Sequence, residues 1–410
     1  MSLGIESYVL PEARVSYFEN VKRIIYGAGS YKAVGSEAKR LGRNGTALLV
    51  TDKGVTKAGL AEKVREVVEK EGLRVDVYDE LSAEPTLESA RKITEVVRGA
   101  KYSVIIGVGG GTVMDSAKVA AVMATNLGDV SNYLAYTEDR VKEKPLPKIL
   151  IPTTAGTGSE VSMYAVIVDE KGVKNFITSP SVLADVAIVD PLMTITCPPR
   201  QTAASGMDAL AHSMENILSL GFTPLSDMYG LQSISLIAAN LRTAYYWGDN
   251  LRARYNMSLA ALLGGLAMGA TPAGANIGHC ISEAIGPIYK IPHGIACAIV
   301  TPYMMEYNLP ACIERLAMVA SYMGLDVHGL PLRKAAIEAI KFVKELVEDL
   351  ELPISLKDVG VPKEDIPKIA DYIMEERQHY YYLQTYNPRK PTKENITELL
   401  EKMYEGRILE

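Results

Sequence analysis

The sequence predicts an α/β N-terminal domain with a parallel sheet, followed by an all-α C-terminal domain. The 410-residue chain is long for a single hydrophobic core, so we expect two domains. In the first half, continuous apolar runs alternate with amphipathic helical stretches, which is typical of strands covered by helices on both faces. After Pro198 and Pro199, apolar residues recur only at helical spacing. We therefore predict domains at 1–195 and 196–410.

The predicted strands and helices of the first domain follow one another in regular order. Strands are expected at Thr46–Thr51, Arg74–Tyr78, Tyr102–Val108, Lys148–Ile151 and Val186–Val189. Helices, where apolar residues recur every three or four positions, are expected at Leu60–Lys70, Leu87–Val97 and Met114–Met123. Strands that alternate with helices in this way pair in parallel, because each helix returns the chain to the same end of the sheet.

The second domain is expected to contain helices alone. Helical spacing runs from Gln201 to Ser219, from Leu225 to Trp247 and from Asn250 to Met268, and it continues towards the C-terminus. The most apolar long segment, Ser258 to Ala270, is shorter than the roughly 20 residues that cross a bilayer, so we interpret it as a buried helix.

Composition excludes several classes of protein. Hydrophobic residues make up 48% of the chain and charged residues 22%, as in ordinary globular domains. The formal net charge of −6 leaves no basic surface of the kind that binds nucleic acid. Four cysteines without a CxxC pair are no disulfide framework, which favours reduced thiols and a cytoplasmic location. Met1–Val15 lacks a charged segment followed by an apolar one, so no secretory signal is expected.

A glycine-rich loop follows the expected strand Tyr102–Val108. Gly109, Gly110 and Gly111 let the backbone approach a ligand closely, and the helix behind them presents free N–H groups. The segment 107–112 matches the dinucleotide fingerprint GxGxxG except at its last position, where Thr112 replaces glycine. The loop favours a site for nucleotide phosphates, with a tight strand–helix turn as the alternative.

Two other strand ends are suited to the same nucleotide. Asp52 follows the strand Thr46–Thr51, where a carboxylate can accept hydrogen bonds from ribose hydroxyls and repel a 2′-phosphate. A helix N-cap is an equally good interpretation of Asp52. The segment Pro152–Glu160 follows another strand and offers several hydroxyl groups beside the same crevice, with a solvated turn as the alternative.

Three of the five histidines accompany an aspartate in the helical half and suggest a metal site. Asp208 and His212 are four residues apart on an expected helix, so their side chains share a face. His279 lies in another expected helix, and His293 follows Pro292. One carboxylate and three imidazoles suit Fe²⁺ or Zn²⁺ better than Ca²⁺ or Mg²⁺. The alternative is a surface Asp–His pair with unrelated histidines.

The order of these motifs resembles that of the iron-containing (group III) alcohol dehydrogenases over nearly the whole chain. The motifs that carry the resemblance are Val50–Asp52, Gly107–Lys118, Pro152–Val161, Ala187–Pro191, Gly206–His212 and Ile291–Gly294. The resemblance implies a Rossmann-like domain and a helical domain, in the dehydroquinate synthase-like architecture, with NAD(P) and a divalent metal in the cleft between them. It also implies a metal-dependent, NAD-dependent alcohol dehydrogenase that acts on small alcohols or aldehydes.

The resemblance further implies a role for individual residues. The implied metal ligands are Asp208, His212, His279 and His293, with Fe²⁺ as the expected ion and Zn²⁺ as the other candidate. The implied cofactor residues, from pyrophosphate to nicotinamide ribose, are Gly109, Gly110, Gly111, Thr153, Thr154, Thr157, Ser162 and Lys174. Asp52 matches the carboxylate that favours NAD over NADP. Such enzymes are often homodimers or larger, and pairing of edge strands through Arg23–Tyr26 is one route to a dimer.

Two positions depart from the family pattern. Thr112 stands where many members have serine, which is a mild change. Glu283 stands four residues after His279, where many alcohol-oxidising members have a further histidine thought to help move the proton. We interpret Glu283 as a candidate catalytic residue that relays a proton or holds a water or a substrate hydroxyl. A helix carboxylate paired with a neighbouring cation is the alternative. The tyrosine-rich segment Gln378–Pro388 is expected beside the cleft, as a mostly apolar wall formed with Leu383 or as packing between helices.

Related activities compete with the dehydrogenase. A dehydroquinate synthase-like lyase or a glycerol-phosphate-type dehydrogenase would share the architecture, the NAD and the metal. Both need basic residues for a phosphate-bearing substrate, and the region Asp208–His293 is poor in Lys and Arg. A cofactor-binding protein without turnover is disfavoured because all four implied ligands are intact. We expect a small-molecule substrate and neither a nucleic-acid nor a membrane partner.

Overall fold

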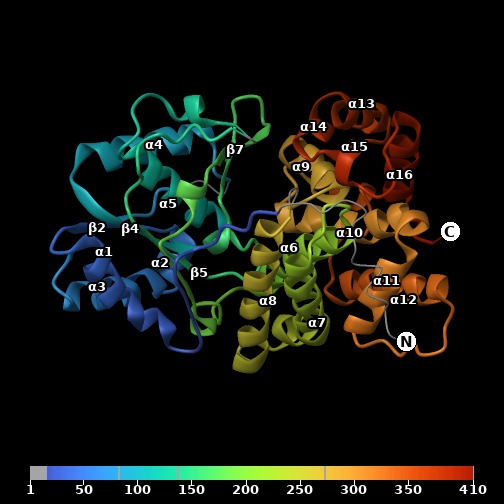
Figure 1. The fold of residues 1–410 in the computed structure, drawn as a ribbon, viewed down its shortest axis with the longest axis horizontal. Helices are drawn as coiled ribbons and strands as arrows, with labels where there is room; N and C mark the ends of the chain where they lie inside the picture. Colours follow the sequence, from blue (N-terminus) through green and yellow to red (C-terminus); the bar gives the residue numbers. More distant parts are fainter. Residues whose placement is uncertain (1–15, 82–83, 136–137, 272–273, 410) are drawn as a thin grey trace.

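The computed structural model describes residues 16–81, 84–135, 138–271 and 274–409. A sheet covered by helices, formed by the first half of the chain, lies beside a bundle of helices formed by the second half (Figure 1). This arrangement confirms the predicted fold class, while the boundary at residues 195 and 196 stays a prediction. Residues 1–15, on which the expected lack of a secretory signal rests, lie outside the described residues.

The N-terminal domain is built on a six-stranded parallel sheet in the order β1-β8-β5-β4-β2-β3. Its strands are β1 (Ile24–Tyr26), β2 (Thr46–Val50), β3 (Arg74–Tyr78), β4 (Tyr102–Gly109), β5 (Lys148–Pro152) and β8 (Val186–Val189). Every strand expected from the sequence is present, and β1 forms one edge. The carboxyl ends of β2, β4 and β5 lie side by side, so the loops that follow them share one edge of the sheet.

Helices cover both faces of this sheet. They are α1 (Val34–Gly42), α2 (Lys53–Lys57), α3 (Leu60–Lys70), α4 (Leu87–Gly99) and α5 (Gly111–Met123). Successive residues of one strand enter different cores: Leu48 packs with α4 and α5, whereas Leu49 packs with α1 and α3. The inner strands β2, β4, β5 and β8 are therefore largely apolar and buried, which is the pattern that predicted them, whereas the edge strand β3 is mostly exposed.

A hairpin in the N-terminal domain is missing from the sequence-based expectations. Strands β6 (Tyr164–Val168) and β7 (Lys174–Thr178) pair antiparallel and lie beside α5. The turn between them contains Gly172, whose φ of +77° suits glycine, and Asp169 Oδ1 accepts hydrogen bonds from two backbone N–H groups of the turn. The hairpin brings Lys174 to the cleft described below.

The C-terminal domain is helical throughout its described residues, as predicted. Its α-helices are α6 (Pro199–Leu218), α7 (Pro224–Tyr246), α8 (Leu251–Gly269), α9 (Ile277–Tyr289), α10 (His293–Asn308), α11 (Ile313–Tyr322), α12 (Leu332–Asp349), α13 (Ile366–Tyr372), α14 (Gln378–Tyr380), α15 (Leu383–Tyr386) and α16 (Lys393–Glu405). Helix α6 is buried along most of its length, because α7, α8, α9 and α10 pack around it. Within the described residues, we find no helix with the length and apolar character needed to span a membrane.

At one contact between the two domains, the backbones of Gly158 and Gly265 approach each other closely. Gly158, in the loop after β5, has a φ of +61° and faces Gly265 of α8. A Cβ atom at Gly158 would lie 2.5 Å from Gly265 Cα, and a Cβ atom at Gly265 would lie 2.8 Å from Gly158 O. A side chain at either position would therefore push the loop and the helix apart.

Candidate active site

A cleft of about 1210 Å³ is lined by residues of both domains. The predicted site residues that line it are Asp52, Gly110, Gly111, Thr153, Thr154, Thr157, Ser162, Lys174, Asp208, His212, His279, Glu283 and His293. Gly109 is the exception. A Cβ atom there would lie 2.4 Å from Val113 Cγ2, so the structure gives this glycine a packing role in the turn from β4 into α5.

The glycine-rich loop places the start of α5 at the cleft. Gly110 is the N-cap of this helix and Gly111 is its first residue. A Cβ atom at Gly111 would lie 2.7 Å from Thr157 Cγ2, so the loops after β4 and β5 are in close contact. The free N–H groups of the first turn and the positive end of the helix dipole suit a phosphate group.

Asp52 is the N-cap of α2, which is one of the two roles expected for it from the sequence. Its Oδ1 accepts a hydrogen bond of 2.9 Å from Val55 N and so caps α2. Among the described residues, none donates to Oδ2. Because Asp52 also lines the cleft, capping leaves this second oxygen available to a ligand.

A buried lysine, Lys118 of α5, holds the loop after β5 in place through hydrogen bonds. Lys118 Nζ donates to Ser159 Oγ at 2.8 Å, to Tyr164 O at 2.6 Å and to Ser162 Oγ at 3.2 Å. Asp115 accepts a hydrogen bond from Ser159 at 2.6 Å and provides the opposite charge. Ser162, a predicted cofactor residue, therefore also has a structural partner.

An aspartate and three histidines converge at the helical side of the cleft. Asp208 and His212 lie on α6, His279 on α9, and His293 is the first residue of α10. Asp208 Oδ1 lies 3.4 Å from His293 Nε2, 3.7 Å from His279 Nε2 and 3.8 Å from His212 Nδ1. The carboxylate thus lies among the three imidazoles that the sequence associated with it.

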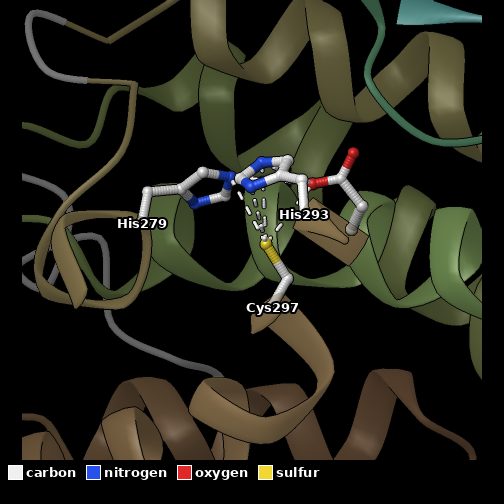
Figure 2. Close-up of side chains that lie close together, drawn as sticks. His279, His293 and Cys297 are labelled. Atoms are coloured by element: carbon white, nitrogen blue, oxygen red, sulfur yellow. Dashed lines mark hydrogen bonds and ion pairs between the residues drawn. The ribbon is translucent and has the colours of Figure 1, made fainter. Parts of the chain in front are cut away.

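Cys297 joins this cluster, although from the sequence we expected it to be only a reduced thiol. Its Sγ lies 3.6 Å from Asp208 Oδ1 and 3.7 Å from His293 Nε2, and Figure 2 shows the thiol directed at both labelled imidazoles. Ligand-capable atoms of Asp208, His279, His293 and Cys297 all lie within 4.8 Å of one another. Cys297 follows His293 by one helical turn on α10, which is the signal that could have identified it.

His212 lies beside the cluster and has an unsatisfied nitrogen. Its ring stacks on that of His279, with 4.4 Å between the centroids. Its Nδ1 is buried and has no hydrogen-bond partner among the residues that the structure describes. A buried polar atom without a partner is costly, and a metal ion bound at this cluster would offset that cost.

Glu215 orients His279 and was also missed from the sequence. Glu215 Oε1 lies 2.5 Å from His279 Nδ1 and accepts a hydrogen bond from His279 N at 3.0 Å. Glu215 Oε2 accepts from Asn276 N at 2.5 Å. The carboxylate acceptor keeps the proton on Nδ1, so Nε2 faces Asp208 as the metal-binding nitrogen. The signal in the sequence is the position of Glu215 on α6, three residues after His212.

Protonation states in the cluster suit a metal. Burial raises the pKa of Asp208, but the nearby His212, His293 and His279 outweigh it, so the pKa lies far below its usual range. Burial lowers the pKa of His212, and it lowers that of His293 to about 3. At His279 the charge of Glu215 outweighs burial and raises the pKa. Metal binding there would release a proton.

Glu283 is both paired with a cation and exposed to the cleft. Its Oε2 accepts a hydrogen bond of 2.7 Å from Arg377 Nη2 and another from the Tyr381 hydroxyl.

The expectation of an apolar wall that includes Leu383 is wrong, because Leu383 is buried in the helical core. Within the segment Gln378–Pro388, Tyr381 lines the cleft, and its hydroxyl group donates to Glu283. Arg377 carried no signal in the sequence, since its partner is 94 residues away.

Comparison with known proteins identifies the family. The iron-containing alcohol dehydrogenase family matches residues 21–191, and the C-terminal part of the Fe-containing alcohol dehydrogenase family matches residues 202–404. Long-chain-alcohol dehydrogenase 1 of Geobacillus thermodenitrificans is 35% identical over 398 residues, which cover 95% of this chain and 99% of that protein. The 1,3-propanediol dehydrogenase of Citrobacter freundii is 36% identical over 410 residues, covering 98% and 100%.

Solved structures show the same fold over nearly the whole chain. A 1,3-propanediol oxidoreductase is similar with a TM-score of 0.90 and 33% identity, over 95% of this chain and 100% of that one. The sulfoacetaldehyde reductase of Bifidobacterium kashiwanohense, in complex with NAD⁺, is similar with a TM-score of 0.83 and 26% identity, over 95% and 99%. The chain therefore belongs to the iron-containing alcohol dehydrogenase family.

Proposed function

We propose that this alcohol dehydrogenase uses a divalent metal and NAD(H) to interconvert a small alcohol and the corresponding aldehyde. The observation that carries the proposal is the meeting of two features in one cleft. A buried cluster of metal-ligand residues around Asp208 faces the same space as the glycine-rich start of α5. Relatives named as dehydrogenases and the relative solved with NAD⁺ support the same assignment.

The proposed metal ligands are Asp208, His212, His279 and His293, and the proposed ion is Fe²⁺, with Zn²⁺ as the other candidate. A bound metal would supply a Lewis acid that lowers the pKa of the alcohol hydroxyl. The protein provides the placement. Asp208 brings a fixed negative charge among the imidazoles, and Glu215 holds the ring of His279 in the binding orientation.

The proposed cofactor residues extend along the other side of the cleft. Gly110 and Gly111 would meet the pyrophosphate, and the residues that would line the nucleotide are Thr153, Thr154, Thr157 and Ser162. Lys174 would reach the nicotinamide ribose and Asp52 the adenosine ribose, which favours NAD over NADP. NAD(H) supplies the hydride chemistry, while the chain fixes the distance between cofactor and substrate.

The function is tested with chelated protein that is reloaded with Fe²⁺ in the absence of oxygen. The loss of NADH absorbance is followed with short, branched and aromatic aldehydes. We expect turnover that requires the metal, with a preferred chain length that reports the size of the pocket. Bound NADH without turnover of any aldehyde would contradict the proposal and favour a phosphorylated substrate, as in a glycerol-phosphate-type dehydrogenase or a dehydroquinate synthase-like lyase.

Gly110→Ala should weaken cofactor binding without unfolding the protein. The backbone of Gly110 has a φ of −78°, and a Cβ atom there would lie 3.4 Å from Thr154 Oγ1, which is an ordinary contact. The methyl group would occupy space that the pyrophosphate needs, so we expect the Kd of NADH to rise about tenfold, or ~1.4 kcal/mol. Fluorescence titration measures this change. Gly99→Ala is the control, because a Cβ atom there meets nothing within 4 Å; equal Kd values in both variants would contradict the assignment.

Asp52→Ala should improve NADP binding relative to NAD. Removing the carboxylate removes repulsion of the 2′-phosphate, and we expect the ratio of the two Kd values to shift about tenfold towards NADP. The variant also loses the cap of α2, which costs about 1 kcal/mol. Thr392→Ala removes the cap of α16 instead and controls for stability alone. If both variants keep the same cofactor preference, Asp52 is a cap and nothing more.

A homodimer stays a prediction. Strand β1 pairs with β8 on one side and forms the edge of the sheet, and its last residue, Tyr26, is 59% exposed. An open strand edge can pair with a second copy of the chain. Light scattering of the purified protein would measure the oligomeric state.

A further inference from the structure

One wall of the cleft holds a carboxylate that has one engaged and one available oxygen. Glu283 lies on α9, one turn after His279, and is 7% exposed. Both of its donors, Arg377 Nη2 and the Tyr381 hydroxyl, reach Oε2. Among the described residues, none donates to Oε1, and this atom is not among the buried atoms that lack a partner. Oε1 is therefore reached from the cleft that Glu283 lines.

Arg377 holds this carboxylate in place. It ends the π-helical turn Ile373–Arg377 and is wholly buried. Its Nη1 donates to Lys174 O at 3.1 Å, and its guanidinium group lies 4.9 Å from the ring centre of Tyr380. With the guanidinium group fixed in this way, the Glu283 side chain cannot turn away from its position. Burial raises the pKa of Glu283, but Lys174 and Arg377 outweigh it and lower the pKa, so the carboxylate is ionised.

We propose that Glu283 Oε1 accepts a hydrogen bond from a second hydroxyl group of the substrate, so that the enzyme prefers short diols to simple alcohols. This inference rests on the proposed function. His279 and Glu283 occupy positions i and i+4 of one helix, so their Cβ atoms are about 5–6 Å apart. The second hydroxyl group must therefore lie within two or three carbon atoms of the reacting one.

The charges around Glu283 favour a neutral donor. Arg377 balances the charge of Glu283, so a substrate ammonium group gains little net attraction from the pair. Lys174 lines the same cleft and adds a positive charge that repels such a group. A carboxylate or sulfonate on the substrate would meet the free oxygen of Glu283, which is a like charge. A hydroxyl group satisfies that oxygen without either conflict.

The test compares kcat/KM for 1,2-propanediol and 1,3-propanediol with that for 1-propanol, using the Fe²⁺-loaded enzyme and NAD⁺. We expect one diol to be preferred about tenfold or more, which is the size of effect that one hydrogen bond to a charged group gives. The double variant Glu283→Met with Arg377→Met removes the ion pair as a unit, because Arg377 alone would be a buried unpaired charge. Its diol preference should fall to about one, mainly through a higher KM for the diol.

Tyr381→Phe is the matched variant, because it removes one donor to Oε2 and leaves the Arg377–Glu283 pair intact. Its diol preference should lie between those of the wild type and the double variant. Quenching or enhancement of NADH fluorescence by each alcohol gives dissociation constants that do not depend on turnover. Equal values for diol and 1-propanol in the wild type, or an unchanged preference in the double variant, contradict the inference.

Other substrates separate this inference from the proposed function. A preference for choline or for 4-hydroxybutanoate over both diols would also contradict the role of Glu283 as an acceptor for a neutral group. If the loaded wild type oxidises 1-propanol and the diols equally well, the dehydrogenase stands and the diol preference fails. If it oxidises no alcohol, the proposed function fails, and the fluorescence measurement still decides whether Glu283 selects diols.

Discussion

Asp208→Ala will abolish metal binding and turnover together while NADH binding stays within about twofold of the wild type. Asp208 is 3% exposed and lies within 3.8 Å of a nitrogen of each of three imidazoles. Removing the carboxylate removes the one negative ligand of the proposed set, and with it the Lewis acid that is worth several kcal/mol in the transition state. We therefore expect kcat/KM to fall about a thousandfold or more. Metal content by mass spectrometry and NADH fluorescence measure the two effects separately.

Cys297→Ala is the matched control for this variant. It removes an atom of the same cluster, 3.6 Å from Asp208 Oδ1, that the proposed ligand set does not include. We expect the variant to keep its metal. If Cys297→Ala loses the metal and His212→Ala keeps it, the ligand set is Asp208, His279, His293 and Cys297. Full activity of Asp208→Ala would refute the metal site itself.

Glu215→Gln should lower metal affinity about 10- to 100-fold, because Glu215 acts on the metal through His279. The carboxylate accepts hydrogen bonds from His279 Nδ1, His279 N and Asn276 N. Glutamine offers one acceptor oxygen, so at least one buried N–H group faces an amide N–H₂ group. Each unsatisfied group costs about 1–3 kcal/mol, and the melting temperature should fall by several degrees. Competition with a chelator of known affinity measures the first effect and calorimetry the second.

Glu306→Gln separates the two effects of the Glu215 change. Glu306 is a carboxylate of the same domain that accepts from Lys402 Nζ at 2.7 Å and from Leu409 N at 3.0 Å, and it does not line the cleft. This variant should lose stability and keep its metal affinity. If Glu215→Gln behaves in the same way, Glu215 has a structural role and does not position His279 for the metal.

Local patterns in the sequence were sufficient to predict the sheet and the main helices. Strands such as β2 and β4 are buried on both faces, so their apolar runs are unbroken, and α3 and α4 have the spacing of half-buried helices. The β6–β7 hairpin was missed although its turn contains Gly172, because one short hairpin does not disturb the alternation of strands and helices on which the prediction rested.

Contacts between distant segments explain what could not be predicted at the site. Asp208 and His212 share one helix, so their spacing indicates a common face. Glu215 meets His279 across 64 residues, and Arg377 meets Glu283 across 94 residues. No local period encodes such pairs, because they depend on how α6, α9 and the π-helical turn pack together. Local chemistry also did not indicate the packing role of Gly109, where a Cβ atom would lie 2.4 Å from Val113 Cγ2.

The contact between Gly158 and Gly265 has a consequence for protein engineering by domain exchange. Gly158 meets Gly265 backbone to backbone with the Val161 side chain beside them, so little side-chain rearrangement can absorb a mismatch between a sheet domain and a helical domain taken from different proteins. A chimera that carries alanine or a larger residue in place of Gly265 would hold its halves farther apart by the width of that side chain. Hydride transfer requires near contact between donor and acceptor, so such a chimera would fold and bind both ligands yet turn over slowly. Recombination partners for this chain should therefore be selected first for glycine at this junction.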